Sequence, residues 1–446
     1  MIDSMPNYSH TDFNSGVVDT INNVLYLGGP FQEINNLKSK AITKYDGLKF
    51  DTLGAGLDPQ WAGIFTPTQV KKTIIFQNKL YVTGQFQKAG KYYSPNLARW
   101  NGSDWDTVNF RFKNGNSTGV AWHMDVYNNE LYLGGNFDSI GGIKANNFAK
   151  FDGVNWHSVS YPYNTCVSAI ANYKGKLFMA GEVTSGSSCA NLAYYDGISW
   201  TPWVGILGDI TKNVVGMKVI DSMLFVYGRF YSIAGTNCMG LAAWNGTKWF
   251  GYGKGVGATG TIRDVSKING DLYISGVFDS INELSTSSGG INNLTNIAKF
   301  DLTNNTWCTI MDAPNNIITF TIEYNNAMYI AGGFTAIGTT PVLPLLKWIG
   351  GNSTISCGST VDVGLTEFIN DFKFSIYPNP TTSTINIVDE NNQLQNATIQ
   401  IKNNLGQLVF ISSFTSQINL SSLSAGMYFL TIEDKSSKKT IKIIKQ

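Results

Sequence analysis

The sequence predicts an all-β chain in which a seven-bladed β-propeller is followed by a small immunoglobulin-like antiparallel β-sandwich. Two patterns lead to this fold class. One short phrase recurs seven times over most of the chain, and a different set of short β-branched runs fills the C-terminal end. The composition agrees, because only 14% of the 446 residues are charged, against roughly 25% in an average soluble protein, whereas Gly (46 residues) and aromatic residues (13%) are abundant.

The recurring phrase approximates Leu-Tyr-x-x-Gly-x-Phe. Its copies are Leu25–Phe31, Leu80–Phe86, Leu131–Phe137, Leu177–Val183, Leu224–Phe230, Leu272–Phe278 and Met328–Phe334. The Gly that the copies share recurs on average about every 50 residues, at Gly29, Gly84, Gly135, Gly181, Gly228, Gly276 and Gly332. A Gly within a strand indicates a bulge or the close approach of another backbone segment. We therefore expect seven units of similar structure that are crowded at this Gly.

A second phrase follows each copy of the first and consists of an aromatic residue, Asp or Asn, and usually Gly. Its copies are Tyr45–Gly47, Trp100–Gly102, Phe151–Gly153, Tyr195–Gly197, Trp244–Gly246, Phe300–Asp301 and the degraded Trp348–Gly350. Asp-Gly and Asn-Gly are strong signals of a β-hairpin, so each unit offers four strands. In the third unit the expected strands are Ala121–Val126, Glu130–Gly135, Phe148–Phe151 and Trp156–Ser160.

Four strands in about 50 residues match the blade of a kelch-like β-propeller. The two phrases resemble the LYxxGxF/WDG propeller repeats that exported bacterial proteins often carry. A right-handed β-helix is the rival fold, but its rungs are typically shorter than about 30 residues. The seventh unit has lost its Asp-Gly, so its outer strand would come either from Ser353–Cys357 or from the stretch before Asn14. We expect the propeller over residues 14–358, a linker over 359–373 and a second domain over 374–446.

The second domain begins with Tyr377-Pro378-Asn379-Pro380, a rigid corner, because two prolines fix φ and lack backbone donors. Short runs between turn residues then predict the strands of a sandwich. These runs are Thr384–Val388, Ala397–Ile401, Leu408–Ser412, Met427–Ile432 and Lys439–Ile444.

Three motifs and a basic tail in this segment resemble the C-terminal sorting domain of type IX secretion. The residues that carry the resemblance are Tyr377, Pro378, Asn379, Pro380, Gly406, Gly426, Tyr428, Lys442 and Lys445. The resemblance implies recognition by the outer-membrane secretion machinery and a location on the surface of a Gram-negative bacterium or outside it, with the domain cleaved off or retained. The alternative is an ordinary immunoglobulin-like module whose lysines only solvate an edge strand. Met1–Asn7 has neither a basic start nor an apolar core, so we expect that a signal peptide is missing from this sequence.

Several classes of function have no support in the sequence. The net charge of +1 gives no footprint for nucleic acid, and no apolar run approaches the roughly 18 residues of a transmembrane helix. No motif for a metal or another cofactor is present, and Cys166, Cys189, Cys238, Cys308 and Cys357 are expected to be mostly buried free thiols.

The repeated acidic residues are interpreted as turn residues and not as catalysts. The slot that holds Asp in most units holds Asn101 and Asn245 in two others, and Asp and Asn share a tolerance of turn conformations. None of the histidines His10, His123 and His157 belongs to a hydrolase motif. We therefore predict no catalytic residue from local motifs, although two carboxylates from distant blades could still meet in space.

Departures from the repeat indicate where a ligand would bind, because long loops on a rigid scaffold often carry binding residues. The insertion at residues 282–296 is one departure, and the exposed aromatic candidates are Trp61, Tyr92 and Tyr93. The leading hypothesis is an exported, non-catalytic module that binds a glycan or a surface protein, as in adhesion. The alternatives are a polysaccharide hydrolase or lyase with carboxylates at one propeller mouth, and a purely architectural surface protein.

Overall fold

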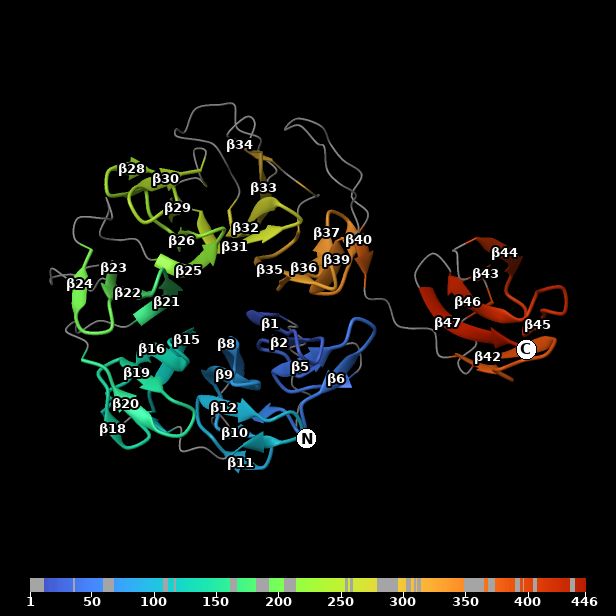
Figure 1. Ribbon diagram of the computed structural model, residues 1–446, viewed down its shortest axis with the longest axis horizontal. Helices are drawn as coiled ribbons and strands as arrows, with labels where there is room; N and C mark the ends of the chain where they lie inside the picture. The colour runs from blue at the N-terminus through green and yellow to red at the C-terminus, as the bar shows by residue number, and fades with distance from the viewer. Residues whose placement is uncertain are drawn as a thin grey trace, which may run out of the picture. The chain divides into compact units, whose positions relative to one another are not determined.

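The computed structural model divides the chain into two compact units, Met1–Thr366 (unit 1) and Glu367–Gln446 (unit 2) (Figure 1). The structure describes residues 12–446 except for 35–36, 59–67, 107–110, 116–117, 161–166, 182–191, 204–213, 253–255, 257–259, 279–295, 302–305, 309, 311–313, 349–364, 368–373, 390–393, 396, 404–406 and 434–437. Both units consist of β-strands, and no helix occurs in the described residues, so the all-β prediction is confirmed.

In the residues that the structure describes, unit 1 forms seven four-stranded sheets, numbered here in chain order. Sheet 1 is β1 (Ser15–Asp19), β2 (Val24–Gly28), β5 (Ile42–Tyr45) and β6 (Phe50–Thr52), and sheet 2 is β8 (Gln69–Phe76), β9 (Lys79–Gln85), β12 (Leu97–Trp100) and β13 (Trp105–Asp106). Sheet 3 is β15 (Val120–Tyr127), β16 (Glu130–Asn136), β19 (Phe148–Phe151) and β20 (Trp156–Ser158), and sheet 4 is β21 (Val167–Tyr173), β22 (Lys176–Gly181), β23 (Leu192–Tyr195) and β24 (Trp200–Pro202). Sheet 5 is β25 (Val214–Ile220), β26 (Met223–Gly228), β29 (Leu241–Trp244) and β30 (Trp249–Gly251), and sheet 6 is β31 (Thr261–Ile268), β32 (Asp271–Val277), β33 (Ile297–Asp301) and β34 (Thr306–Cys308). Sheet 7 is β35 (Ile318–Tyr324), β36 (Ala327–Gly332), β39 (Leu345–Trp348) and β40 (Leu365–Glu367).

Short additional strands occur in the segments that connect the strands of these sheets, mostly between the second and third strands. They are β3 (Glu33–Ile34), β4 (Leu37–Lys38), β7 (Leu57–Asp58), β10 (Lys88–Ala89), β11 (Tyr92–Tyr93), β14 (Phe112–Lys113), β17 (Ser139–Ile140), β18 (Ile143–Lys144), β27 (Ser232–Ile233), β28 (Thr236–Asn237), β37 (Ala336–Ile337) and β38 (Thr340–Pro341).

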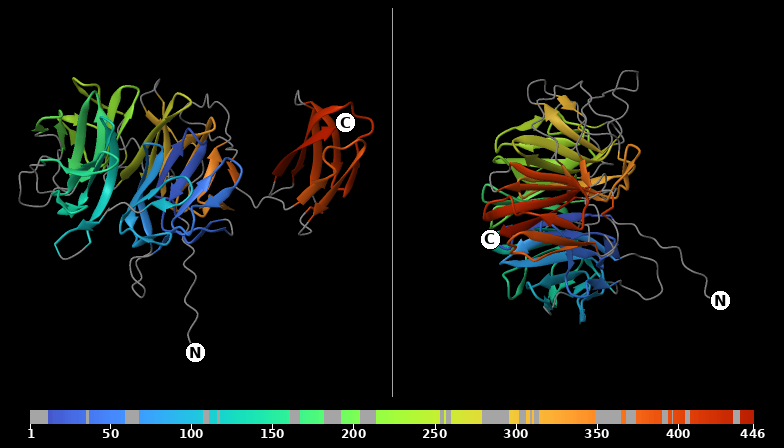
Figure 2. Two further views of the ribbon diagram at one scale, coloured as in Figure 1. Left: turned by 60° about the horizontal axis from the view of Figure 1, so that its bottom comes forward. Right: turned by 90° about the vertical axis from the view of Figure 1, so that its right-hand side faces the viewer.

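The first strand of each sheet, here called the inner strand, lies nearest the centre of unit 1 (Figure 1). The inner strands are β1, β8, β15, β21, β25, β31 and β35. Each contacts the inner strand of the next sheet, and β35 contacts β1. Figure 2 shows the sheets from the side, with their strands running across the thickness of the unit. The apolar core fills the spaces between consecutive sheets, where separate clusters of buried side chains each join two neighbours.

A repeated tyrosine hydrogen bond joins neighbouring sheets at the end of their inner strands. The hydroxyl of Tyr127 donates to the carbonyl oxygen of Gly175 in the next sheet at 2.8 Å, and that of Tyr173 donates to Ser222 at 3.0 Å. Tyr324 in sheet 7 makes the same bond to Asn23 in sheet 1 at 2.7 Å. The contact between the last and first sheets is therefore built like the contacts between sheets that follow each other in the chain.

In six units the shared Gly lies opposite an irregularity in the inner strand. A β-bulge follows the residue paired with Gly84, Gly135 and Gly276, and a Cβ added to these glycines would lie only 2.0–2.2 Å from a carbonyl oxygen of the inner strand. The prediction of a bulge or close backbone approach at this Gly is confirmed, since no side chain fits there.

The repeated Asp and Asn residues close the outer hairpins. In each of five units one side-chain oxygen accepts hydrogen bonds from the backbone N–H groups two and three residues further on, as from Val154 and Asn155 to Asp152, both at 2.7 Å. The five acceptors are Asp46, Asn101, Asp152, Asp196 and Asn245. Asp and Asn make the same two bonds, which confirms that this position serves the turn.

The outer strand of sheet 7 comes from neither of the two segments that the sequence left open. It is β40, Leu365–Glu367, which lies within the stretch expected to be a linker. Ser353–Cys357 and the residues before Asp12 lie outside the described residues. The repeat could not reveal β40, because that strand lacks the aromatic and Asp-Gly signals of the other units.

Unit 2 consists of two antiparallel sheets that share one apolar core. One sheet is β41 (Phe374–Tyr377), β42 (Thr384–Asp389) and β45 (Gln417–Asn419), and the other is β44 (Leu408–Ser413), β43 (Thr398–Asn403), β46 (Gly426–Glu433) and β47 (Lys438–Lys445). The five strands predicted in this segment are present within two residues of the expected ends.

The thiol prediction is right for one cysteine and wrong for another. Cys238 is a buried free thiol, and burial raises its pKa to about 12. Cys308 is disulfide-bonded, although the spacing of related positions argued against such a bond. The spacing argument assumed repeats of identical geometry, and it does not hold for Cys308.

Candidate functional site

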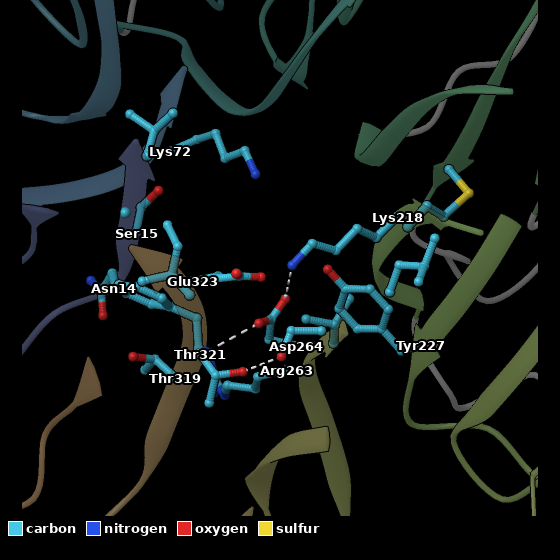
Figure 3. A pocket seen from close by; sticks show the side chains of 18 of the residues that line it. Asn14, Ser15, Lys72, Lys218, Tyr227, Arg263, Asp264, Thr319, Thr321 and Glu323 are labelled. Atoms are coloured by element: carbon cyan, nitrogen blue, oxygen red, sulfur yellow. Dashed lines mark hydrogen bonds and ion pairs between the residues drawn. The ribbon is translucent and has the colours of Figure 1, made fainter. Parts of the chain in front are cut away.

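Unit 1 contains a cavity of about 1170 Å³ between its inner strands, shown from close by in Figure 3. Residues from all seven inner strands line it. Each inner strand pairs with the second strand of its own sheet and contacts the inner strands on both sides. Most of the side chains in the cavity are therefore carried on a hydrogen-bonded backbone, although Asp221 and Asn269 lie in turns.

Six of the inner strands carry a β-bulge, and the extra residue of each bulge lines the cavity. These bulge residues are Lys71, Trp122, Ser168, Val215, Arg263 and Thr319. A bulge redirects side chains locally, and the residues directly after four of the bulges, Lys72, His123, Asp264 and Phe320, line the same cavity. We call the part of the cavity lined by the bulge residues the bulge end.

Basic side chains predominate in the cavity, where five of them meet three acidic ones. The basic residues are Lys71, Lys72, Lys218, Arg263 and Lys267, and the acidic residues are Asp221, Asp264 and Glu323. The Asp264 carboxylate accepts hydrogen bonds from Lys218 Nζ at 3.2 Å and from the Thr321 backbone N–H at 3.1 Å, as the dashed lines in Figure 3 show.

Two acidic groups, Asp221 and Glu323, lie at the end of the cavity opposite the bulge residues. Asp221 forms an ion pair with Lys267. Glu323 lies four residues beyond the bulge residue Thr319 on β35, which corresponds to roughly 13 Å along a strand. Lys71, Lys72 and Arg263 have no carboxylate within ion-pair distance in the part of the chain that the structure describes.

The cavity environment weakens protonation of Lys71 and Lys72. Burial, followed by the positive charge of Arg263, lowers the pKa of Lys71. Burial and then the charge of Lys218 lower the pKa of Lys72, which Asp125 and Asp264 partly offset. Like charges therefore face one another here without full compensation.

His123 is a neutral donor in this cavity. Burial and the nearby Lys72 lower its pKa well below the usual value. Its Nδ1 accepts the backbone N–H of Ile170 at 3.3 Å, so the proton of the neutral ring resides on Nε2. Burial and then Asp264 raise the pKa of Tyr227 well above its usual value, so this phenol is also a donor and not a base.

The aromatic residues predicted from the sequence lie elsewhere. Tyr93 is 54% exposed, with the Arg111 guanidinium 5.6 Å from its ring centre, whereas Tyr92 packs against the apolar core between sheets 1 and 2. Neither tyrosine lines the cavity, and Trp61 lies outside the described residues.

The cavity residues themselves were not identified from the sequence, although a signal existed. In six units the bulge residue precedes the shared Gly by 13 positions, as Lys71 precedes Gly84 and Arg263 precedes Gly276. An alignment of the repeats at this position would have identified Lys71, Trp122 and Arg263 together, but only once the bulge was known to occur there.

In unit 2 several predicted sorting-signal residues meet at the last strand. Asn379 Oδ1 accepts the backbone N–H of Ile444 at 2.9 Å, and its Nδ2 donates to the carbonyl oxygen of Lys442 at 2.7 Å. Gly426 pairs with Lys445 in the register of β46 and β47. Tyr428 is buried and donates its hydroxyl to the Ser424 carbonyl oxygen at 2.9 Å.

Among the described residues, no hydrogen bond joins the remaining predicted signal residues to β47. Tyr377 is 53% exposed at the end of β41, ahead of Pro378 and Pro380, and Gly406 lies outside the described residues.

Residues 375–446 match the model of the secretion system C-terminal sorting domain. This segment is therefore a sorting domain of type IX secretion, and it implies interaction with that secretion machinery. The chain is exported to the outer-membrane surface or beyond. Within the described residues, no helix has the length and apolar character that crossing a membrane requires.

Two comparisons with solved structures gave distant similarity. The extracellular domain of the hybrid two-component system BT3049 from B. thetaiotaomicron shares 11% identity at a TM-score of 0.47, over 98% of this chain and 55% of that one. The corresponding domain of BT4673 from the same organism shares 10% identity at a TM-score of 0.46, over 98% and 56%. The chain thus spans little more than half the length of either structure. No curated protein matches the sequence.

Proposed function

We propose that the chain is an exported, kelch-like seven-bladed β-propeller that binds a glycan in its central cavity without chemical conversion. The single observation that carries this proposal is the cavity of about 1170 Å³ lined by all seven inner strands. A concave, largely preformed site with polar groups on fixed backbone is the usual form of a small-ligand or saccharide site.

The domain organisation in this proposal is a propeller from residue 14 onward, a short linker, and the immunoglobulin-like sorting domain over residues 374–446. The contacts between the inner strands of sheets 7 and 1 support a complete ring. Sheet 7 includes β40, so we place the end of the propeller at Glu367 and the linker over residues 368–373.

A glycan suits this cavity better than a folded protein partner. The site is a recess between inner strands, which admits a narrow chain, whereas a protein interface normally needs roughly 800 Å² of surface on each partner. Trp122 supplies an aromatic ring at the bulge end, and Ser168 and Thr319 supply hydroxyl groups there. Tyr93 and Trp61 remain proposed outer contacts for a longer ligand.

A hydrolase or lyase has weaker support. Two of the three carboxylates that line the cavity, Asp264 and Asp221, are engaged in ion pairs. Hydrolysis of a glycosidic bond needs a pair of carboxyl groups placed on either side of that bond.

For the sorting domain we propose that Asn379, Gly426, Tyr428, Lys442 and Lys445 act together as the recognised signal, flanked by Tyr377, Pro378, Pro380 and Gly406. The hydrogen bonds from Asn379 to β47 support a composite signal, because they join the first motif to the basic tail.

The test uses the full-length chain with immobilised polysaccharides of several classes. Bound protein and released oligosaccharides are measured in the same samples. Retention without product is expected. Shortened or unsaturated sugars would overturn the non-catalytic assignment, and the absence of retention on every polysaccharide would overturn glycan binding.

A further inference from the structure

The basic residues at the bulge end approach the cavity from opposite sides of unit 1. Lys71 belongs to β8 in sheet 2 and Arg263 to β31 in sheet 6, and sheets 7 and 1 separate them along the shorter path between inner strands. Lys72 follows Lys71 on β8, and Figure 3 shows its side chain pointing into the open space. All three cations line the same cavity, and Lys71 lies close enough to Arg263 for the charge of Arg263 to lower its pKa.

Among the described residues, the carboxylates around this volume form no ion pair with these three cations. Asp264 accepts bonds from Lys218 and from the Thr321 backbone N–H. Asp125, whose charge offsets the lowered pKa of Lys72 more than that of Asp264 does, accepts the backbone N–H of Asn172 at 2.9 Å. Glu323 and Asp221 lie at the opposite end. An anion placed between Lys71 and Arg263, within reach of Lys72, would offset the repulsion between the first two cations.

The remaining groups at the bulge end are suited to a sugar ring. Trp122 lies on β15, the inner strand next to β8, and it is only partly buried. An indole face that remains accessible can pack against the apolar face of a pyranose, while a guanidinium offers a planar pair of donors for a carboxylate or sulfate.

We propose that the bulge end of the cavity binds the anionic group of an acidic glycan, with Lys71, Lys72 and Arg263 holding a carboxylate or a sulfate ester and Trp122 stacking on the sugar. This inference rests on the proposed function and narrows its substrate class. It requires no covalent step and no cofactor.

The experiment measures binding of the full-length chain by calorimetry. The probes are oligogalacturonate, which carries carboxylates, a sulfated galactan oligosaccharide of similar length, and a neutral galactan oligosaccharide. The test variant is K71Q/R263Q, and the matched control is K88Q/K113Q, because Lys88 and Lys113 are exposed and line no part of the cavity.

The expected result is that one acidic probe binds at least tenfold more tightly than the neutral probe, and the preferred probe distinguishes carboxylate from sulfate. K71Q/R263Q should lose at least tenfold in affinity for that probe, whereas K88Q/K113Q should change less than threefold. The wild-type affinity should also fall steadily between 50 and 300 mM salt, a readout that does not depend on folding of the variant.

Two results would overturn the inference in different ways. Equal binding of acidic and neutral probes, or equal affinity in the two variants, would refute the anion site and leave glycan binding in place. If no probe of any charge binds, both the anion site and the proposed function fail.

Discussion

Replacing the shared Gly of sheet 3 should disrupt the bulge that shapes the cavity. In Gly135→Ala the new Cβ would lie 2.1 Å from the Val120 carbonyl oxygen and 2.6 Å from the Ala121 Cα, whereas ordinary contacts begin near 3.4 Å. Both neighbours are backbone atoms and cannot rotate away, so β15 and β16 must separate by about 1 Å.

The expected loss of stability follows from this separation. Overpacking of a well-packed interior costs about 1–3 kcal/mol, and a weakened ladder hydrogen bond adds about 1 kcal/mol. We therefore expect Gly135→Ala to lower the free energy of unfolding of unit 1 by about 3 kcal/mol. Urea denaturation followed by circular dichroism measures this change in the full-length chain.

Gly142→Ala is the matched control from the same sheet region. Gly142 has a φ of +91° and nothing within 4 Å of an added Cβ, so this substitution costs only backbone strain of about 1–2 kcal/mol. Only Gly135→Ala should also weaken glycan binding, because Trp122 and His123 sit at the bulge. A Gly135→Ala loss no larger than that of Gly142→Ala would refute the close-approach argument.

Three further predictions concern the sheet contacts, the sorting signal and a hairpin. Tyr324→Phe should lower the free energy of unfolding by about 1 kcal/mol, as much as Tyr127→Phe, since each removes one tyrosine hydrogen bond between neighbouring sheets. The midpoints of urea denaturation of the two variants measure these losses. An effect of Tyr127→Phe alone would mean that sheets 7 and 1 are not joined like the others. Asn379→Ala removes two hydrogen bonds to β47 and should reduce surface display several-fold, measured by labelling intact cells against Asn22→Ala; undiminished display would exclude Asn379 from the signal. The pKa of Asp152 is lowered to about 2, first by the Asn155 N–H and then by His157, so its stabilising effect is present above pH about 4 and is lost as pH falls toward 2. The difference in thermal midpoint between wild type and Asp152→Ala should therefore shrink between pH 4 and 2, and a difference that stays constant would contradict this assignment.

The sequence predicted the strands well because their signals are local. In sheet 3 the four expected strands differ from the observed ones by no more than two residues at either end. The paired Asp-Gly and Asn-Gly signals depend on turn geometry that two or three residues determine, so no tertiary information was required.

The cavity could not be predicted in the same way. Lys71 and Arg263 are almost two hundred residues apart, and nothing near either of them indicates the other. Their juxtaposition depends on the order of sheets around the centre and on a bulge in each inner strand. The sequence showed the Gly opposite the bulge, but not which side chains the bulge would redirect. The outer strand β40 was missed for a different reason, since it lacks the repeat signals.

The position of β40 limits where a protease could remove the sorting domain without damage to sheet 7. Sheet 7 takes its fourth strand from Leu365–Glu367, and the sorting domain begins with β41 at Phe374. A signal peptidase that removes the sorting domain while leaving sheet 7 intact must therefore cleave between Glu367 and Phe374. Cleavage even a few residues earlier would release a mature protein with an exposed β39 edge, which could pair with the same edge of another molecule. A cut within residues 368–373 would thus leave sheet 7 with all four strands, whereas an earlier cut would expose the edge of β39.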